Sequence, residues 1–136
     1  MIKSLHMFDK NLISKENIGM MSPQKLAFIG DAVYELMVRQ KIISNNEGNI
    51  GNLNALKVKN VCCTAQSELY EKIKNSLTEE ENEIYKRGRN AYVSHSPKNI
   101  SPAIYHRATG IEALFGYLYL NSQLERLNEF INLLSL

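Results

Sequence analysis

The first clear pattern along the chain is a helix start signal followed by apolar residues at helical spacing. Ser22 followed by Pro23 supplies an N-cap and a proline at the first helical position. The pattern predicts a helix over residues 23–43, ended by the polar and glycine-containing segment 44–52. The expected core-facing stripe of this helix recurs every three or four residues and consists of Leu26, Ile29, Val33, Leu36 and Met37.

The same start signal occurs a second time near the end of the chain. Ser101 followed by Pro102 predicts a helix that reaches about residue 120. Its apolar stripe consists of Ile104, Ala108, Ile111, Phe115 and Leu118. We also assign to the core the aromatic residues toward its end, Phe115, Tyr117 and Tyr119.

The remaining segments also favour helices. A less regular apolar pattern predicts one helix over residues 53–77, and Thr78 with Glu81 forms a capping-box sequence that begins a helix reaching residue 89. A loop over 92–100 and a last helix over 124–134 complete the pattern. No pair of segments alternates as strands do, so we expect an all-α fold. Residues 1–20 are interpreted as a poorly patterned leader and residues 21–136 as one domain.

Composition adds little to this picture. The 136 residues are 44% hydrophobic with a formal net charge of +2, which is normal for a folded domain and favours no partner by itself. No apolar run approaches the roughly 20 residues of a membrane-spanning helix, and no secretory signal is present, so we expect a cytoplasmic protein without membrane contact. The two cysteines, Cys62 and Cys63, are adjacent in a predicted helix and are interpreted as packing residues.

Basic side chains without acidic neighbours gather in one stretch of this nearly neutral chain. Between Glu83 and Glu112 there is no acid, and the interval contains Lys86, Arg87, Arg89, His95, Lys98, His106 and Arg107. Such a cluster suits contact with a phosphate backbone. Gly88, which has no side chain, would let the protein backbone come close to a phosphate. A solvated helix end explains the same cations, but the long absence of acids favours RNA contact. The predicted RNA-binding residues are Lys86, Arg87, Arg89, Asn90, Lys98 and Asn99.

Two acids occupy unusual places in the two predicted helices that begin with Ser-Pro. Asp31 lies at the edge of its apolar stripe and follows Gly30, while Glu112 directly follows a stripe residue and precedes Gly116 by one turn. An acid at such an edge needs a partner or a metal ion, and a glycine inside a helix suggests close packing against another helix. If the two helices pack there, the carboxylates form a site for a hard cation. A buried ion pair or cap fits the same residues.

Three short motifs in the right order resemble the ribonuclease III catalytic domain. Residues 26–35, LAFIGDAVYE, resemble its signature helix, and residues 112–116, EALFG, resemble its second acidic motif. Residues 86–91, KRGRNA, followed by residues 97–99, PKN, resemble the Mini-III branch, which lacks a double-stranded-RNA-binding domain. The resemblance spans about residues 22–121.

The resemblance implies an all-helical homodimer that cuts double-stranded RNA with Mg²⁺. Asp31 takes the place of the signature-helix catalytic acid and Glu112 that of the essential metal-binding acid. The implied reaction is an endonucleolytic hydrolysis that produces 5′-phosphomonoesters, and the implied substrate is the stem of 23S rRNA precursor, whose 5′ and 3′ ends it would mature. A ribosomal protein on the precursor is a further partner that the resemblance allows.

The chain departs from the family pattern at three acidic positions. Full-length members carry acids where this chain has Gln24, Ala27 and Thr109, which leaves the number of metal ions open. The losses motivate an alternative, a non-catalytic RNA-binding or ribosome-assembly protein on the same fold, and a helical protein-interaction module is a second. Glu35, one turn after Asp31, is either an indirect support of the site or a solvated acid. Neither histidine of the basic stretch is assigned a catalytic role.

Overall fold

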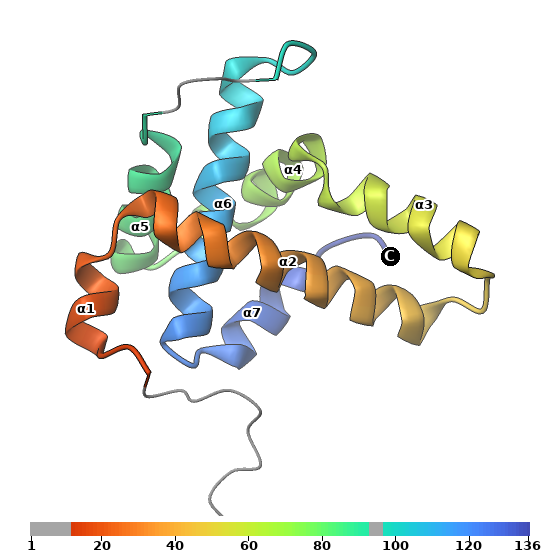
Figure 1. Ribbon diagram of the computed structural model, residues 1–136, viewed down its shortest axis with the longest axis horizontal. Helices are drawn as coiled ribbons and strands as arrows, with labels where there is room; N and C mark the ends of the chain where they lie inside the picture. Colours follow the sequence, from red (N-terminus) through yellow and green to blue (C-terminus); the bar gives the residue numbers. More distant parts are fainter. Residues whose placement is uncertain (1–11, 93–96) are drawn as a thin grey trace, which may run out of the picture.

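The computed structural model describes residues 12–92 and 97–136, and within these ranges the chain forms helices and no strands (Figure 1). The elements are α1 (Lys15–Met20), α2 (Pro23–Asn45), α3 (Ile50–Val61), α4 (Cys63–Ile73), η1 (Lys74–Ser76), α5 (Glu79–Arg89), α6 (Pro102–Leu120) and α7 (Leu124–Ile131). The all-α prediction is confirmed. None of the described helices is both long enough and apolar enough to cross a membrane.

Helix α6 is the centre of the molecule. It packs most extensively against α2, α5 and α4, and Figure 1 shows α2 crossing it. Nearly every residue from Ala108 to Leu118 is buried, because neighbours cover α6 on several sides. A helix that is apolar around its whole circumference is expected at the core of a domain. The prediction that Phe115 and Tyr117 belong to the core is confirmed, and Tyr119 is half-buried against it.

The three predicted helix starts are present with their caps. The side chains of Ser22, Thr78 and Ser101 each accept a hydrogen bond from the backbone N–H three residues further on, at 3.1–3.3 Å. At Thr78 the capping box is complete, because Glu81 accepts the Thr78 backbone N–H at 2.9 Å. These bonds satisfy N–H groups that have no partner inside the helix.

The buried side of α2 differs from the predicted stripe. Leu36 is 61% exposed, while Ile29, Val33 and Met37 are only half-buried. The fully buried line runs instead through Leu26, Gly30, Tyr34, Val38 and Ile42. The apolar pattern did not reveal this line, because two of its members are not typical core residues. Gly30 is buried through backbone contact, and Tyr34 can be buried because its hydroxyl donates to the Asn60 carbonyl at 2.9 Å.

The single helix predicted over residues 53–77 is two helices. Cys62 has extended backbone angles (φ −70°, ψ 161°) between α3 and α4, so the two cysteines lie at a helix break. The Tyr34 hydroxyl donates to the Asn60 carbonyl, which is near the end of α3 and has no helical partner there. The break lets α3 pack along α2 while α4 packs against α6.

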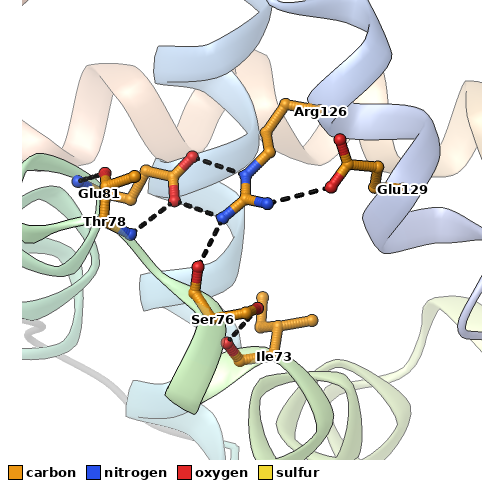
Figure 2. Close-up of polar contacts among 6 residues, drawn as sticks. All are labelled: Ile73, Ser76, Thr78, Glu81, Arg126 and Glu129. Carbon is orange, nitrogen blue, oxygen red and sulfur yellow. Dashed lines mark hydrogen bonds and ion pairs between the residues drawn. The ribbon is translucent and has the colours of Figure 1, made fainter.

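Helix α7 is held to the start of α5 by a partly buried ion pair (Figure 2). Arg126 donates from Nε to Oε2 of Glu81 at 2.8 Å and from Nη2 to Oε1 at 2.7 Å. The same Nη2 donates to the Ser76 carbonyl at 2.7 Å, and Nη1 donates to Glu129 at 3.0 Å. Glu81 is 4% exposed, and a carboxylate is costly to bury alone. The bidentate pairing with Arg126 stabilises it.

The predicted leader contains structure at its end. Helix α1 buries Ile18, which is 1% exposed, in the common core. The amphipathic signal was missed because six residues are too few to show a helical period. Residues 1–11 lie outside the described part of the chain.

Candidate active site

The backbones of α2 and α6 touch where both helices carry glycine. A Cβ built on Gly30 would lie 1.7 Å from the carbonyl oxygen of Glu112, and one built on Gly116 would lie 2.0 Å from that of Leu26. No side chain fits between the helices at these two points. The close packing expected from Gly30 and Gly116 is therefore present, and it fixes the crossing of α2 over α6.

This contact brings the two predicted catalytic acids together. Asp31 follows Gly30 on α2, and Glu112 provides the very carbonyl that Gly30 meets. The two carboxyl groups lie within hydrogen-bonding reach of each other, although 81 positions separate them in the chain (112 minus 31). Asp31 is exposed and Glu112 is half-buried, so the pair lies where the protein interior meets solvent.

The environment of Glu112 disfavours its negative charge. Burial, and next the neighbouring Asp31 carboxyl, raise the pKa of Glu112 from 4.5 to about 8, while the amide of Gln66 acts in the opposite direction. Two carboxylates that share one small region cannot both ionise easily without a positive partner. Perturbation of this kind is common at functional sites.

An open groove of about 980 Å³ runs along α2 beside the acidic pair. Asp31 and Glu112 both line it, and so do the three positions where the family pattern has further acids, Gln24, Ala27 and Thr109. Its remaining lining residues are Phe28, Ile29, Ala32, Glu35, Leu36, Arg39 and Tyr105. The acidic positions of the family pattern thus all line one groove, whichever residue occupies them in this chain.

The acidic pair fits a hard divalent cation. Two carboxylates meet there, and the proton that Glu112 retains at neutral pH is one that a cation would displace. Across residues 12–92 and 97–136, no group of three or more His, Cys, Asp or Glu could hold an ion. Much of the coordination shell would therefore come from water or substrate phosphate, which Mg²⁺ accepts readily.

Two neighbours of the pair, Glu35 and Cys63, can be explained without a part in the chemistry. The Glu35 carboxylate forms an exposed ion pair with Arg39, one helical turn further on, with 2.7 Å between Oε2 and Nη2. The carboxylate is therefore already engaged. Burial, followed by the nearby Glu112, raises the pKa of the Cys63 thiol, which keeps it neutral beside the acids. Neither residue therefore needs a part in the chemistry to explain its place.

The predicted basic residues differ in how they are used. Arg87 donates to the carbonyls of Met21 at 2.7 Å and Gly19 at 3.3 Å, so it ties α5 to the end of α1 and to the segment that follows it. The expected role of Gly88 beside a phosphate is wrong. A Cβ there would lie 2.7 Å from the side chain of Ala113, because Gly88 is buried where α5 packs on α6.

The other predicted RNA-binding residues lie at the end of α5 and beyond it. Lys86, Asn90, Lys98 and Asn99 are exposed, whereas Arg89 is half-buried 5.9 Å from the Tyr85 ring. None of these residues lines the groove of the acidic pair. His95 lies outside the described residues, and the half-buried His106 packs edge-on against Tyr105.

The sequence interpretation missed Gln66, which faces the acidic pair from α4. A signal was present, because Gln66 shares a helical face with two apolar residues, Leu69 and Ile73, and both are fully buried. A polar residue on such a face is unusual and warrants a search for its partner.

Comparison with known proteins identifies the family. The model of the ribonuclease III domain matches residues 24–123 of this chain. A crystal structure of a protein from Fusobacterium nucleatum superimposes with a TM-score of 0.77 at 35% identity, covering 85% of this chain and 93% of that one.

Curated relatives narrow the assignment. Mini-ribonuclease 3 of Thermoanaerobacter sp. (strain X514) is 43% identical over 98% of this chain and 95% of its own length. Mini-ribonuclease 3 of Clostridium tetani is 42% identical over 88% of this chain and 80% of its own length. The chain therefore belongs to the Mini-ribonuclease 3 branch of the ribonuclease III family and is an endoribonuclease of that type.

Proposed function

We propose that this endoribonuclease depends on magnesium, cuts double-stranded RNA as a homodimer and matures the 5′ and 3′ ends of 23S rRNA precursor in the cytoplasm. The observation that carries the metal dependence is the meeting of Asp31 and Glu112 at the edge of an open groove. The family assignment supports the substrate class. A purely structural scaffold has no evident use for two carboxyl groups that oppose each other's ionisation.

In this proposal Asp31 and Glu112 hold the ion, and Glu112 gives up its proton when the ion binds. The chemistry that magnesium supplies when bound is polarisation of the scissile phosphate and activation of a water molecule. Hydrolysis of the phosphodiester bond leaves a 5′-phosphate on one product and a 3′-hydroxyl on the other. Because an A-form duplex hides its base edges in a deep, narrow groove, selection of the RNA rests on shape and backbone contacts.

An exposed apolar face of α2 supports the homodimer. Phe28 is 85% exposed and Leu36 is 61% exposed, with the exposed Ala32 between them at helical spacing. Large apolar residues that line up on a surface usually mark an interaction site. All three also line the groove of the acidic pair, so a second copy bound here would bring two catalytic sites close together along one RNA duplex.

Light scattering should therefore give a molar mass about twice the 15.5 kDa of the chain. Leu36→Glu should shift the protein toward the monomer, because it places a charge in the apolar contact. Leu12→Glu is the matched control, since Leu12 is 79% exposed on another segment. A wild-type protein that stays monomeric at high micromolar concentration would contradict the proposal.

The function itself is tested by incubating the protein with duplex RNA in Mg²⁺ and in chelator. We expect cutting in Mg²⁺, products with 5′-phosphates and no cutting in chelator. RNA that is bound but left intact in Mg²⁺ would point to the non-catalytic alternative. Cutting that continues unchanged in chelator would remove the metal from the mechanism.

The basic residues at the end of α5 and beyond predict a salt-dependent contribution to RNA binding. Lys86→Gln with Lys98→Gln should weaken binding and lower the slope of log affinity against log salt by about 0.9 for each phosphate that is no longer neutralised. These two lysines are chosen because Arg87 already holds the segment between α1 and α2. A matched pair, Lys15→Gln with Lys74→Gln, changes the net charge equally from other exposed positions. Equal slopes for the two double variants would contradict the assignment.

A further inference from the structure

Gln66 is a buried amide whose donor group lacks a partner. Its side chain is 2% exposed on α4, and no hydrogen-bond acceptor satisfies its Nε2 among the described residues. Buried polar groups are nearly always hydrogen-bonded, so an unsatisfied one in a well-packed core calls for a physical reason. The amide faces the carboxyl group of Glu112 and favours the charged form of that carboxyl.

The position of the amide is fixed by the packing of α4 on α6. Gln66 lies on the same face of α4 as Leu69 and Ile73, and both of these are fully buried. The break at Cys62 separates α4 from α3. Gln66 is therefore held by two apolar anchors beyond it, and it cannot turn away to solvent.

We propose that Gln66 is a positioning residue for Glu112. Its Nε2–H donates to one carboxylate oxygen of Glu112 when that carboxylate is engaged by the divalent ion, so the other oxygen is directed at the ion. The inference rests on the proposed magnesium-dependent function. The Nε2 of Gln66 has no hydrogen-bond partner in the part of the chain that the structure describes. This agrees with the behaviour of hydrogen bonds in active sites, which are often long or poorly aligned until substrate is bound.

An amide suits this place better than a charged group. A lysine or arginine beside Glu112 would compete with the cation, and another carboxyl would add to the repulsion between Asp31 and Glu112. A neutral donor orients the carboxylate without changing the charge of the site. Partners of this kind behind a metal ligand typically contribute about 10- to 100-fold to metal affinity or activity.

The test is Gln66→Met, which keeps the length and flexibility of the side chain but removes the amide. Binding of Mn²⁺ to the RNA-free protein, followed by the electron paramagnetic resonance of the free ion, should weaken about tenfold. The Mg²⁺ concentration that gives half-maximal cleavage should rise by a similar factor. Affinity for duplex RNA in chelator should stay unchanged.

The matched control is Gln123→Met, because Gln123 is exposed and its side chain makes no capping hydrogen bond. Unchanged Mn²⁺ affinity in Gln66→Met would overturn the positioning role, even if cleavage were slower. If the wild-type protein neither cleaves RNA nor binds Mn²⁺, the proposed function fails. If it does both and Gln66→Met does so equally well, only the role of Gln66 fails.

A measurement on the unaltered protein covers the case in which Gln66→Met does not fold. The side-chain amide resonances of Gln66 should shift during a Mg²⁺ titration, with the same saturation curve as the backbone amide of Glu112. Gln66 resonances that stay in place while those of Glu112 move would overturn the proposal.

Discussion

Replacing Asp31 by Asn or Glu112 by Gln should lower the rate of duplex RNA cleavage at least about a thousandfold, or ~4 kcal/mol of transition-state stabilisation. Each change keeps the shape of the side chain and removes one of the two carboxylates that meet beside the groove. Because both residues would hold the same ion, the double variant should be little worse than either single one. Single-turnover cleavage at saturating protein measures the effect.

Glu112→Gln should at the same time stabilise the metal-free protein at alkaline pH. The pKa of Glu112 is raised from 4.5 to about 8 in the folded state, mainly by burial and then by Asp31. The folded protein thus holds a proton that the unfolded chain has lost, and stability falls as the pH rises from about 4.5 to about 8. Denaturant unfolding without metal should show that fall in the wild type and a smaller one in Glu112→Gln.

Glu35→Gln is the control variant for the cleavage and the unfolding measurements. Glu35 lines the same groove, but its carboxylate already pairs with Arg39. Its loss should change the cleavage rate by less than about tenfold, a small effect typical of exposed ion pairs on a helix. If Asp31→Asn or Glu112→Gln cleaved as fast as Glu35→Gln, that residue would have no part in the reaction.

Replacing Gly116 by Ala should destabilise the fold by at least about 3 kcal/mol, despite the better helix propensity of alanine. The added Cβ would lie 2.0 Å from the carbonyl oxygen of Leu26. Because the obstacle is backbone, no rotamer change can relieve the clash and α2 must move away from α6. We expect the melting temperature to fall by about 10 °C or more in calorimetry.

Gly19→Ala makes the same substitution where it should be harmless. A Cβ on Gly19 would have nothing within 4 Å, so only the helix propensity changes. Stability should stay the same or rise by up to about 1 kcal/mol. If Gly116→Ala were equally harmless, the two helices could not be in backbone contact, and the reason given for the closeness of Asp31 and Glu112 would be wrong.

Local signals in the sequence predicted most of the helices. Ser22, Thr78 and Ser101 each begin a helix where the capping pattern placed it, because an N-cap depends only on residues three or four positions away. The break at Cys62 was missed because no proline or glycine marks it. The hydrogen bond from Tyr34 to the Asn60 carbonyl, just before the break, joins residues 26 positions apart and leaves no local signal.

The meeting of Asp31 and Glu112 could be predicted from the sequence, whereas the rest of the candidate site could not. Gly30 and Gly116 indicated a close helix crossing and the two acids adjoin it, so the sequence predicted that Asp31 and Glu112 lie close together, as they do in the structure. Gly88 carried the same packing signal but was assigned to phosphate binding, because its basic neighbours suggested a surface. Arg87 and Gln66 show the same limit, since the partner of each lies on an element far away in the sequence.

The ion pair between Arg126 and Glu81 has a consequence for folding during synthesis of the chain. Glu81 is synthesised 45 residues before Arg126, so a growing chain carries this carboxylate without its guanidinium partner. Phe130, which packs near Phe115, is also missing until then. A product that stops before residue 124 keeps an open apolar core, the kind of surface that chaperones and proteases act on. We therefore expect a product without α7 to be degraded faster in the cell than a chain that contains it.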